Sequence, residues 1–261
     1  MSPAEIQALT TLLAPHLISV ALISTRLLPV ALLCPWLGGQ LAPSQVKLGL
    51  VVSLALCLHG AGGIAVVEVP TAWGFSALAL REAVFGVSLG LIAALPADAA
   101  RMGGRFIDLF RGASAEAFNP ASGTRESAVG EALYQLVVAL GAMGVALPMV
   151  LGGLWHSFSM VKLGAYVPTE AGALQVAALA GTAMGTGLAV GAPIAGVALA
   201  TDCLMGLIAR AAPQLNIQDT GAPLKLLGGG AVLWLTLGLL VERLMGDVAT
   251  STGAFARLLH G

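Results

Sequence analysis

Six apolar blocks, separated by turn-rich segments, dominate the pattern of hydrophobic and polar positions along the chain. They are Leu12–Leu33, Leu48–Leu58, Trp73–Leu95, Ala132–Leu154, Ala171–Ala200 and Leu226–Val241. A membrane-spanning helix takes about 20 apolar residues, and only the fourth and fifth blocks meet this length comfortably. The second block would cover roughly 16 Å of a hydrocarbon core about 30 Å thick. Bent or re-entrant helical hairpins, buried among other helices, therefore fit several blocks better than straight spans.

The third block carries two charged residues near its middle, Arg81 and Glu82. Insertion into lipid at mid-depth costs each of them roughly 2.5–3.5 kcal/mol. Neighbours at i and i+1 point in different directions on a helix, so they cannot fully neutralise each other. We expect each to have its own partner, on another helix or another subunit.

The same pairing role is predicted for every charge that lies within or beside an apolar block. The set is Arg26, Arg81, Glu82, Asp202 and Lys225. A proton or ion relay is the alternative interpretation of buried ionisable groups. Pairing between helices or subunits is favoured, because the set is spread over four blocks and contains no chain of carboxylates.

Charge is concentrated in the middle of the chain, where nine of the 25 charged residues lie between Asp98 and Glu131. The first part predicts an amphipathic helix ending at Gly112, with one charged face made by Asp98, Arg101, Arg105 and Asp108. The following segment is rich in Gly, Ser, Ala and Pro and has no helical pattern, which is typical of a functional loop. The whole chain, 1–261, is predicted to form a single domain: N-terminal hairpins (1–97), a charged helix and loop (98–131), and C-terminal hairpins (132–261).

Composition places the chain among membrane proteins. Hydrophobic residues make up 57% and charged residues 10%, and the mean hydropathy is +0.92, whereas soluble domains carry about 25% charged residues. Prolines inside and beside the apolar blocks punctuate helices, so the predicted fold class is all-α. A net charge of −1 gives no reason to expect nucleic-acid binding.

Side chains capable of metal or redox chemistry show no productive spacing. Cys34, Cys57 and Cys203 are isolated in apolar surroundings and are interpreted as buried small hydrophobes. The four histidines have neither ligand spacing nor a carboxylate cluster beside them, and no phosphate-binding loop is present. We therefore expect no metal-binding and no cofactor-binding residues.

One motif matches a hydrolase pattern, the G-x-S-x-G of residues 86–90 centred on Ser88. In hydrolases that serine rides a strained strand-to-helix turn, whereas this one lies in a helical block. An intramembrane serine protease with His156 as base is the alternative, but no orienting group or oxyanion donor can be nominated. Helix packing explains the two glycines more simply, so the chain is predicted to have no catalytic residue and to be no enzyme.

Three segments carry a family resemblance. Arg81-Glu82-Ala-Val-Phe-Gly86-Val-Ser-Leu-Gly90, the late Ala212-Pro-Gln-Leu-Asn-Ile217 followed by Gly221-Ala-Pro-Leu-Lys225, and the early Arg26-Leu-Leu-Pro29 resemble signatures of one protein family. It is the family of the flagellar export protein FliR and its injectisome counterpart SctT, the T subunit of the type III secretion export gate. Ile107–Ala113 and Gly123–Ser127 resemble the injectisome branch more than the flagellar one.

The resemblance implies a non-enzymatic subunit of a type III secretion export gate, through which unfolded polypeptides cross the bacterial inner membrane. Bent hairpins of this multi-pass subunit would wind into a helical multi-subunit assembly with R-type and S-type subunits, held largely on the periplasmic side and touching membrane lipid. The U-type switch protein and the V-type export gate protein are further expected partners. A small-solute transporter, or an accessory subunit of one, is the rival interpretation.

The family's loop between its central helices is proposed to plug the closed channel. Carried over to this sequence, the plug is Ala113–Ser127, with Phe110 and Phe118 as its bulky side chains. The other residues expected to act in gating are Asn119, Pro120 and Gly123. The alternative for this segment is a solvated linker.

Overall fold

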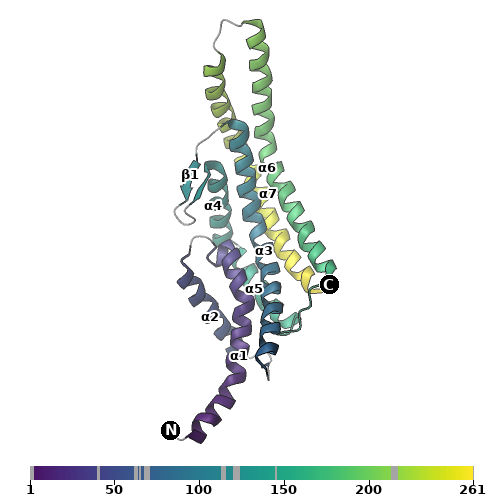
Figure 1. Ribbon diagram of the computed structural model, residues 1–261. Coiled ribbons are helices and arrows are strands. Elements are labelled where there is room, and N and C mark those ends of the chain that lie inside the picture. Colours follow the sequence, from purple (N-terminus) through teal and green to yellow (C-terminus); the bar gives the residue numbers. More distant parts are fainter. Residues whose placement is uncertain are drawn as a thin grey trace. The chain divides into compact units, whose positions relative to one another are not determined.

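The computed structural model describes residues 3–39, 42–61, 64, 66–67, 71–112, 116–119, 124–144, 146–212 and 217–260. Figure 1 shows the order of elements along the chain. They are α1 (Pro3–Leu33), the short 3-10 helix η1 (Pro35–Leu37), α2 (Ser44–Gly60), α3 (Ala72–Arg111), β1 (Glu116–Asn119), β2 (Thr124–Ser127), α4 (Ala128–Met143), α5 (Ala146–Met160), α6 (Glu170–Ala211) and α7 (Ile217–His260). The predicted all-α class is confirmed, with one small hairpin added to it.

Four of the described helical segments are long and apolar enough to cross a membrane: Leu12–Leu33, Ala72–Arg111, Glu170–Ala211 and Pro223–Val248. The fourth apolar block, predicted to span comfortably, is instead divided into α4 and α5. The division has a local cause, because Pro148 has no N–H to donate to the carbonyl of Gly144. The helix α2, with 17 residues, reaches about 25 Å and is shorter than a full span.

The chain forms two compact units, each assembled from segments distant in sequence. Unit 1 comprises Met1–Ala94, Gly144–Ala178 and Thr250–Gly261, and unit 2 comprises Leu95–Met143 and Leu179–Ala249. Helix α3 contributes to both units, and the division within it falls next to Pro96. Helix α3 is uninterrupted from Ala72 to Arg111, and it ends before Gly112 as predicted; the φ of Gly112 is +64°.

Glycine lets α1 and α3 approach closely within unit 1. A Cβ atom at Gly86 would lie 2.2 Å from the carbonyl oxygen of Arg26, and one at Gly90 would lie 3.0 Å from that of Pro29. Gly187 does the same in unit 2, where a Cβ would lie 2.8 Å from the carbonyl oxygen of Ala99. Small residues at these positions therefore serve helix packing, as the spacing predicted.

The cysteines divide into one buried and two exposed thiols. Cys34 precedes η1 and is fully enclosed, and burial raises the pKa of its thiol to about 11. Its interpretation as a small buried hydrophobe is confirmed. The same interpretation is wrong for Cys57 and Cys203, which are exposed. Apolar neighbours in the sequence do not by themselves bury a side chain, because burial also needs another segment packed against that face of the helix.

Candidate functional site

A buried ion pair joins α1 to α3 in unit 1. Arg26 donates from Nε to Oε2 of Glu82 over 2.5 Å and from Nη2 to Oε1 over 3.1 Å. Both side chains have an exposed fraction of 0%. This is the two-pronged arrangement in which arginine and carboxylate bind most strongly, and its full enclosure makes the loss of either partner costly.

The guanidinium of Arg26 also caps α5. Nη1 donates to the carbonyl of Ser157 and Nη2 to that of Val161, each over 3.1 Å. Carbonyls at the end of a helix have no partner within it, so a cation placed there satisfies them and also interacts favourably with the helix dipole. The rings of Phe158 and Phe85 lie with their centroids 4.3 Å and 4.9 Å from the guanidinium carbon.

Gly164 completes this group of residues, here called the Arg26–Glu82 cluster (Arg26, Glu82, Phe85, Phe158 and Gly164). Its N–H donates to Glu82 Oε1 over 2.6 Å. Its φ of +75° favours glycine, and a Cβ there would lie 2.6 Å from Cδ2 of Leu78. The segment after α5 is thereby fixed to α3 through a position that has no room for a side chain.

Arg81 has a different environment from its neighbour Glu82. The adjacent charges do not pair with each other, as the sequence predicted. Arg81 is exposed, and Nη1 donates to the carbonyl of Gly164 over 3.4 Å, longer than an ordinary hydrogen bond. Glu82 is thus satisfied by partners within the chain, while Arg81 keeps donors facing outward.

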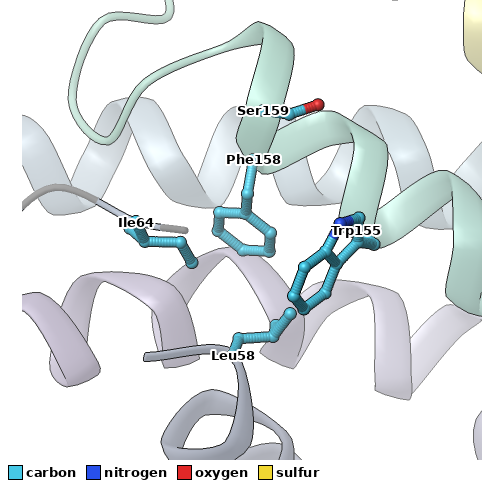
Figure 2. A pocket seen from close by; sticks show the side chains of 5 residues that line it. All are labelled: Leu58, Ile64, Trp155, Phe158 and Ser159. Atoms are coloured by element: carbon cyan, nitrogen blue, oxygen red, sulfur yellow. The ribbon is translucent and has the colours of Figure 1, made fainter. Parts of the chain in front are cut away.

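Phe158 also lines a small cavity in unit 1. Its lining residues, labelled in Figure 2, are Leu58 of α2, Ile64, and Trp155, Phe158 and Ser159 of α5. Its volume is about 60 Å³, well below the 300–1,000 Å³ of a typical small-molecule site. This cavity is therefore too small to be the substrate site of a solute transporter.

In unit 2, the segment predicted as an irregular plug loop contains a β-hairpin. Strands β1 and β2 pair antiparallel, with Phe118 opposite Arg125 and Asn119 opposite Thr124. These eight residues are not helical, in agreement with the sequence pattern, but the hairpin that they form was not predicted. Each four-residue strand is too short to show an alternating pattern in the sequence, which is why the hairpin was missed. Pro120 and Gly123 lie outside the described residues.

One end of the hairpin is held by Asp108 on α3. Its Oδ2 accepts hydrogen bonds from Ser127 Oγ over 2.6 Å and from the N–H of Val129 over 2.9 Å. Ser127 Oγ in turn accepts from the N–H of Gly130 over 3.0 Å, the pattern of a helix N-cap. We call Asp108, Ser127 and Val129 the Asp108 clamp; it fixes the end of β2 and the start of α4.

The predicted charged face of α3 is divided: Arg101 and Asp108 are buried next to α4, whereas Asp98 and Arg105 are exposed. A Cβ at Gly104 would lie 2.4 Å from Cα of Gly130. Arg101 Nη2 lies 3.3 Å from Glu131 Oε2, and its guanidinium carbon lies 3.7 Å from the ring centroid of Tyr134. The backbone of α3 near Arg101 therefore lies close to α4, which gives the Asp108 clamp a firm base.

The remaining predicted residues lie elsewhere in unit 2. Phe110 belongs to the last turn of α3, not to the loop, and its ring meets that of Phe106 edge to face at 4.7 Å. Lys225 on α7 forms an ion pair with Asp202 on α6. The structure therefore joins four of the five predicted pairing residues into two pairs and leaves Arg81 with its single long hydrogen bond.

The positions of Ser88 and His156 in the structure do not support the hydrolase alternative. Ser88 lies inside α3, and its Oγ donates to the carbonyl of Val84 in the preceding turn. Nδ1 of His156 lies 3.4 Å from Oγ of Ser159. The G-x-S-x-G glycines serve the packing of α3 on α1, so the motif is a feature of helix packing.

Several residues of these clusters were not singled out by sequence. Ser157 and Val161 contribute only backbone carbonyls, which carry no signal in a sequence. Gly164 could have been noticed as an isolated glycine just after an apolar block. Ser127 directly precedes Ala128, the first residue of α4, and a serine just before an apolar helical run is an N-cap signal.

These observations define the class of protein: a helical membrane protein in which Arg26 pairs with Glu82, and Lys225 with Asp202, within the chain. Residues 17–250 match the family described as bacterial export proteins, family 1. The chain belongs to this family. The predicted relationship is therefore confirmed, and the chain is a member of the bacterial protein export machinery.

Relatives with curated names occur in two export systems. The chain is 29% identical over 153 residues to the flagellar biosynthetic protein FliR of Bacillus subtilis, covering 57% of this chain and 59% of that protein, less than two thirds of its length. It is 26% identical to FliR of Aquifex aeolicus, over 86% of this chain and 87% of that protein. It is 27% identical to Yop proteins translocation protein T of Yersinia pestis, over 80% and 82%. These identities overlap and do not separate the flagellar branch from the other.

Proposed function

We propose that this chain is a subunit of a type III protein export gate, which forms and seals the channel for unfolded protein substrates across the bacterial inner membrane. The observation that carries the proposal is the family match over residues 17–250. Four described segments long and apolar enough to span a membrane support it, as do the ion pairs Arg26–Glu82 and Lys225–Asp202. The subunit works with R-type and S-type partners, the U-type switch protein and the V-type export gate protein, largely on the periplasmic side of the membrane.

The hairpin β1–β2 and its connection act as the seal. Ser127 at the end of β2 is fixed by the Asp108 clamp, while the two strands pair over only four residues each. An isolated two-stranded hairpin is marginally stable. A small element with one firm attachment can occlude a channel and still be displaced by a polypeptide, because its opening costs little free energy.

The seal is tested by deleting residues 115–123 and measuring ion or small-solute leakage across the membrane. The deletion is expected to raise leakage while the assembled particle is recovered in normal amount, because the clamp and both helices that carry it remain. Leakage at the wild-type level would show that the hairpin is a linker. Loss of the particle would show that the segment serves assembly instead.

The chain works in an injectisome and not in a flagellum. Ile107–Ala113 and Gly123–Ser127 support this branch. Expression in two strains, one lacking its flagellar counterpart and one lacking its injectisome counterpart, tests the assignment. Restored secretion in the injectisome strain alone is expected, and restored motility alone would reverse the assignment.

The work of the subunit is conformational, and it catalyses no reaction. The Ser88 hydroxyl is bonded to its own helix, and the curated relatives are named for flagellar biosynthesis and translocation. Energy for transport then comes from other components of the apparatus. The cavity of Figure 2 is too small for a solute site, so it gives no support to the solute-transporter alternative.

A further inference from the structure

The outer face of α3 in unit 1 carries a regular apolar stripe. Its members are spaced alternately by four and three residues and are all exposed: Trp73, Ala77, Leu80, Val84, Val87 and Leu91. This is the a/d spacing of a coiled-coil seam, which receives the side chains of one neighbouring helix. The opposite face of α3, with Phe85 and Leu89, is buried within the chain.

Arg81 lies beside this stripe with most of its hydrogen-bonding capacity unused. A guanidinium has five N–H donors, and across the part of the chain that the structure describes, Arg81 has the single 3.4 Å hydrogen bond to Gly164. Its neighbours on the exposed face, Leu80 and Val84, are apolar. The surface therefore combines one strong cation with a seam of aliphatic side chains.

Lipid is a poor occupant for this surface. Arg81 lies within α3, an apolar helix long enough to cross a membrane. A charge exposed to lipid within such a helix is costly unless it is paired. Glu82 shows how the chain treats such a charge, since it is enclosed and bonded to Arg26 and Gly164.

We infer that this face is the docking surface for one helix of another subunit, which packs along the stripe and places an Asp or Glu carboxylate on Arg81. Charge complementarity selects the carboxylate, because arginine binds it through two parallel hydrogen bonds. The spacing of the stripe selects a helix, and its aliphatic side chains select apolar residues on the partner. The inference rests on the proposed function, since it requires a multi-subunit assembly.

The test begins with a photoreactive amino acid placed at Leu80 or at Val84 in the complete assembly. The expected adduct is a helix of another subunit that has an acidic residue within one turn of the attachment point. An adduct with lipid alone, or with a helix lacking such an acid, would overturn the inference. A chain that is always extracted as a lone monomer would instead overturn the proposed function.

Charge reversal gives the second arm. Arg81→Glu is expected to lower the adduct yield and the co-purified partner by at least about tenfold. Changing the mapped acidic residue of the partner to Arg is expected to restore both. Failure of the paired change to restore them, with each chain still present in the membrane, would contradict the pairing.

Lys162→Glu is the matched control, because Lys162 is an exposed cation in the same unit and lies two residues from Gly164. It changes the net charge as Arg81→Glu does but lies off the stripe, so the adduct yield is expected to remain at the wild-type level. An equal loss in both variants would show a general charge effect and would overturn the inference. Thermal denaturation of Arg81→Glu is expected to match that of the wild-type chain, since Arg81 makes only one long hydrogen bond within it.

Discussion

The Arg26–Glu82 cluster of unit 1 and the Asp108 clamp of unit 2 use carboxylates in opposite ways. Glu82 on α3 is fully enclosed and bonded to a guanidinium from α1 and to an N–H of the connection after α5. Asp108 is also buried, but its hydrogen bonds hold the end of a short hairpin and the first turn of the helix that follows it, and its other oxygen lies 3.8 Å from Nη1 of Arg111 on its own helix. The first arrangement fixes a core, while the second anchors an element that can open at its other end.

The energetic consequence follows from burial. Removing one partner from an enclosed ion pair leaves an uncompensated charge and costs about 3–5 kcal/mol. Removing an N-cap hydroxyl costs about 0.5–2 kcal/mol and acts locally. The two regions should therefore differ both in the size of the loss and in how far it spreads.

Arg26→Ala is expected to give the largest effect. It strands Glu82 and removes the donors to the α5 carbonyls, so the loss should be about 3–5 kcal/mol. Thermal denaturation of the purified chain in detergent measures it as a midpoint lowered by roughly 6–20 °C.

The double variant Arg26→Met with Glu82→Leu is the control for that change. It removes both charges while keeping much of the volume, so it should recover a large part of the lost stability. Recovery will be incomplete, because Ser157 and Val161 still lose their donor. A double variant no more stable than Arg26→Ala would show that helix capping, and not the ion pair, sets the stability of this cluster.

Gly164→Ala should be the next most damaging change. The φ of +75° disfavours alanine by about 1–2 kcal/mol, and the added Cβ would displace Leu78, adding a similar amount. Gly49→Ala is the matched control, since Gly49 lies within α2 and a Cβ there meets nothing within 4 Å. The same denaturation assay should show that the control is neutral or slightly stabilised. Equal losses in the two variants would show that the close contact between Gly164 and Leu78 does not stabilise unit 1.

The sequence predicted the helices better than it predicted the contacts between them. Apolar blocks and the stop at Gly112 gave the all-α class, and the charge of Arg26 and Glu82 marked both as needing partners. Prolines within the blocks were expected to kink or end helices, but the block that contains Pro148 was still predicted to span comfortably, because its average hydropathy favours a span. Partners such as the Ser157 carbonyl are backbone groups and depend on tertiary packing alone.

The hairpin shows the same limit at shorter range. Residues 116–119 and 124–127 contain few apolar side chains, and strands this short have no period that could be read. Their pairing depends on Asp108, which lies 19 positions before Ser127 along the chain. Asp108 was recognised as part of a charged helical face, but its role in holding β2 is visible only once α3 and α4 are packed.

The smallest effects are expected for two serine substitutions, and the serines differ in the groups that their hydroxyls bind. Ser127→Ala should cost about 0.5–2 kcal/mol locally, because the hydroxyl joins Asp108 to the N–H of Gly130. Ser88→Ala should stay within about 0.5 kcal/mol of wild type, because that hydroxyl bonds only to its own helix at Val84. Protease cleavage within residues 113–127 and ion leakage through the assembled particle should both rise for Ser127→Ala alone.

If Ser88→Ala abolished protein export while the particle remained intact, that result would support the hydrolase interpretation. If Ser127→Ala left both measurements unchanged, the Asp108 clamp would not hold the hairpin. The two carboxylates, Glu82 and Asp108, would then not differ in the way proposed above.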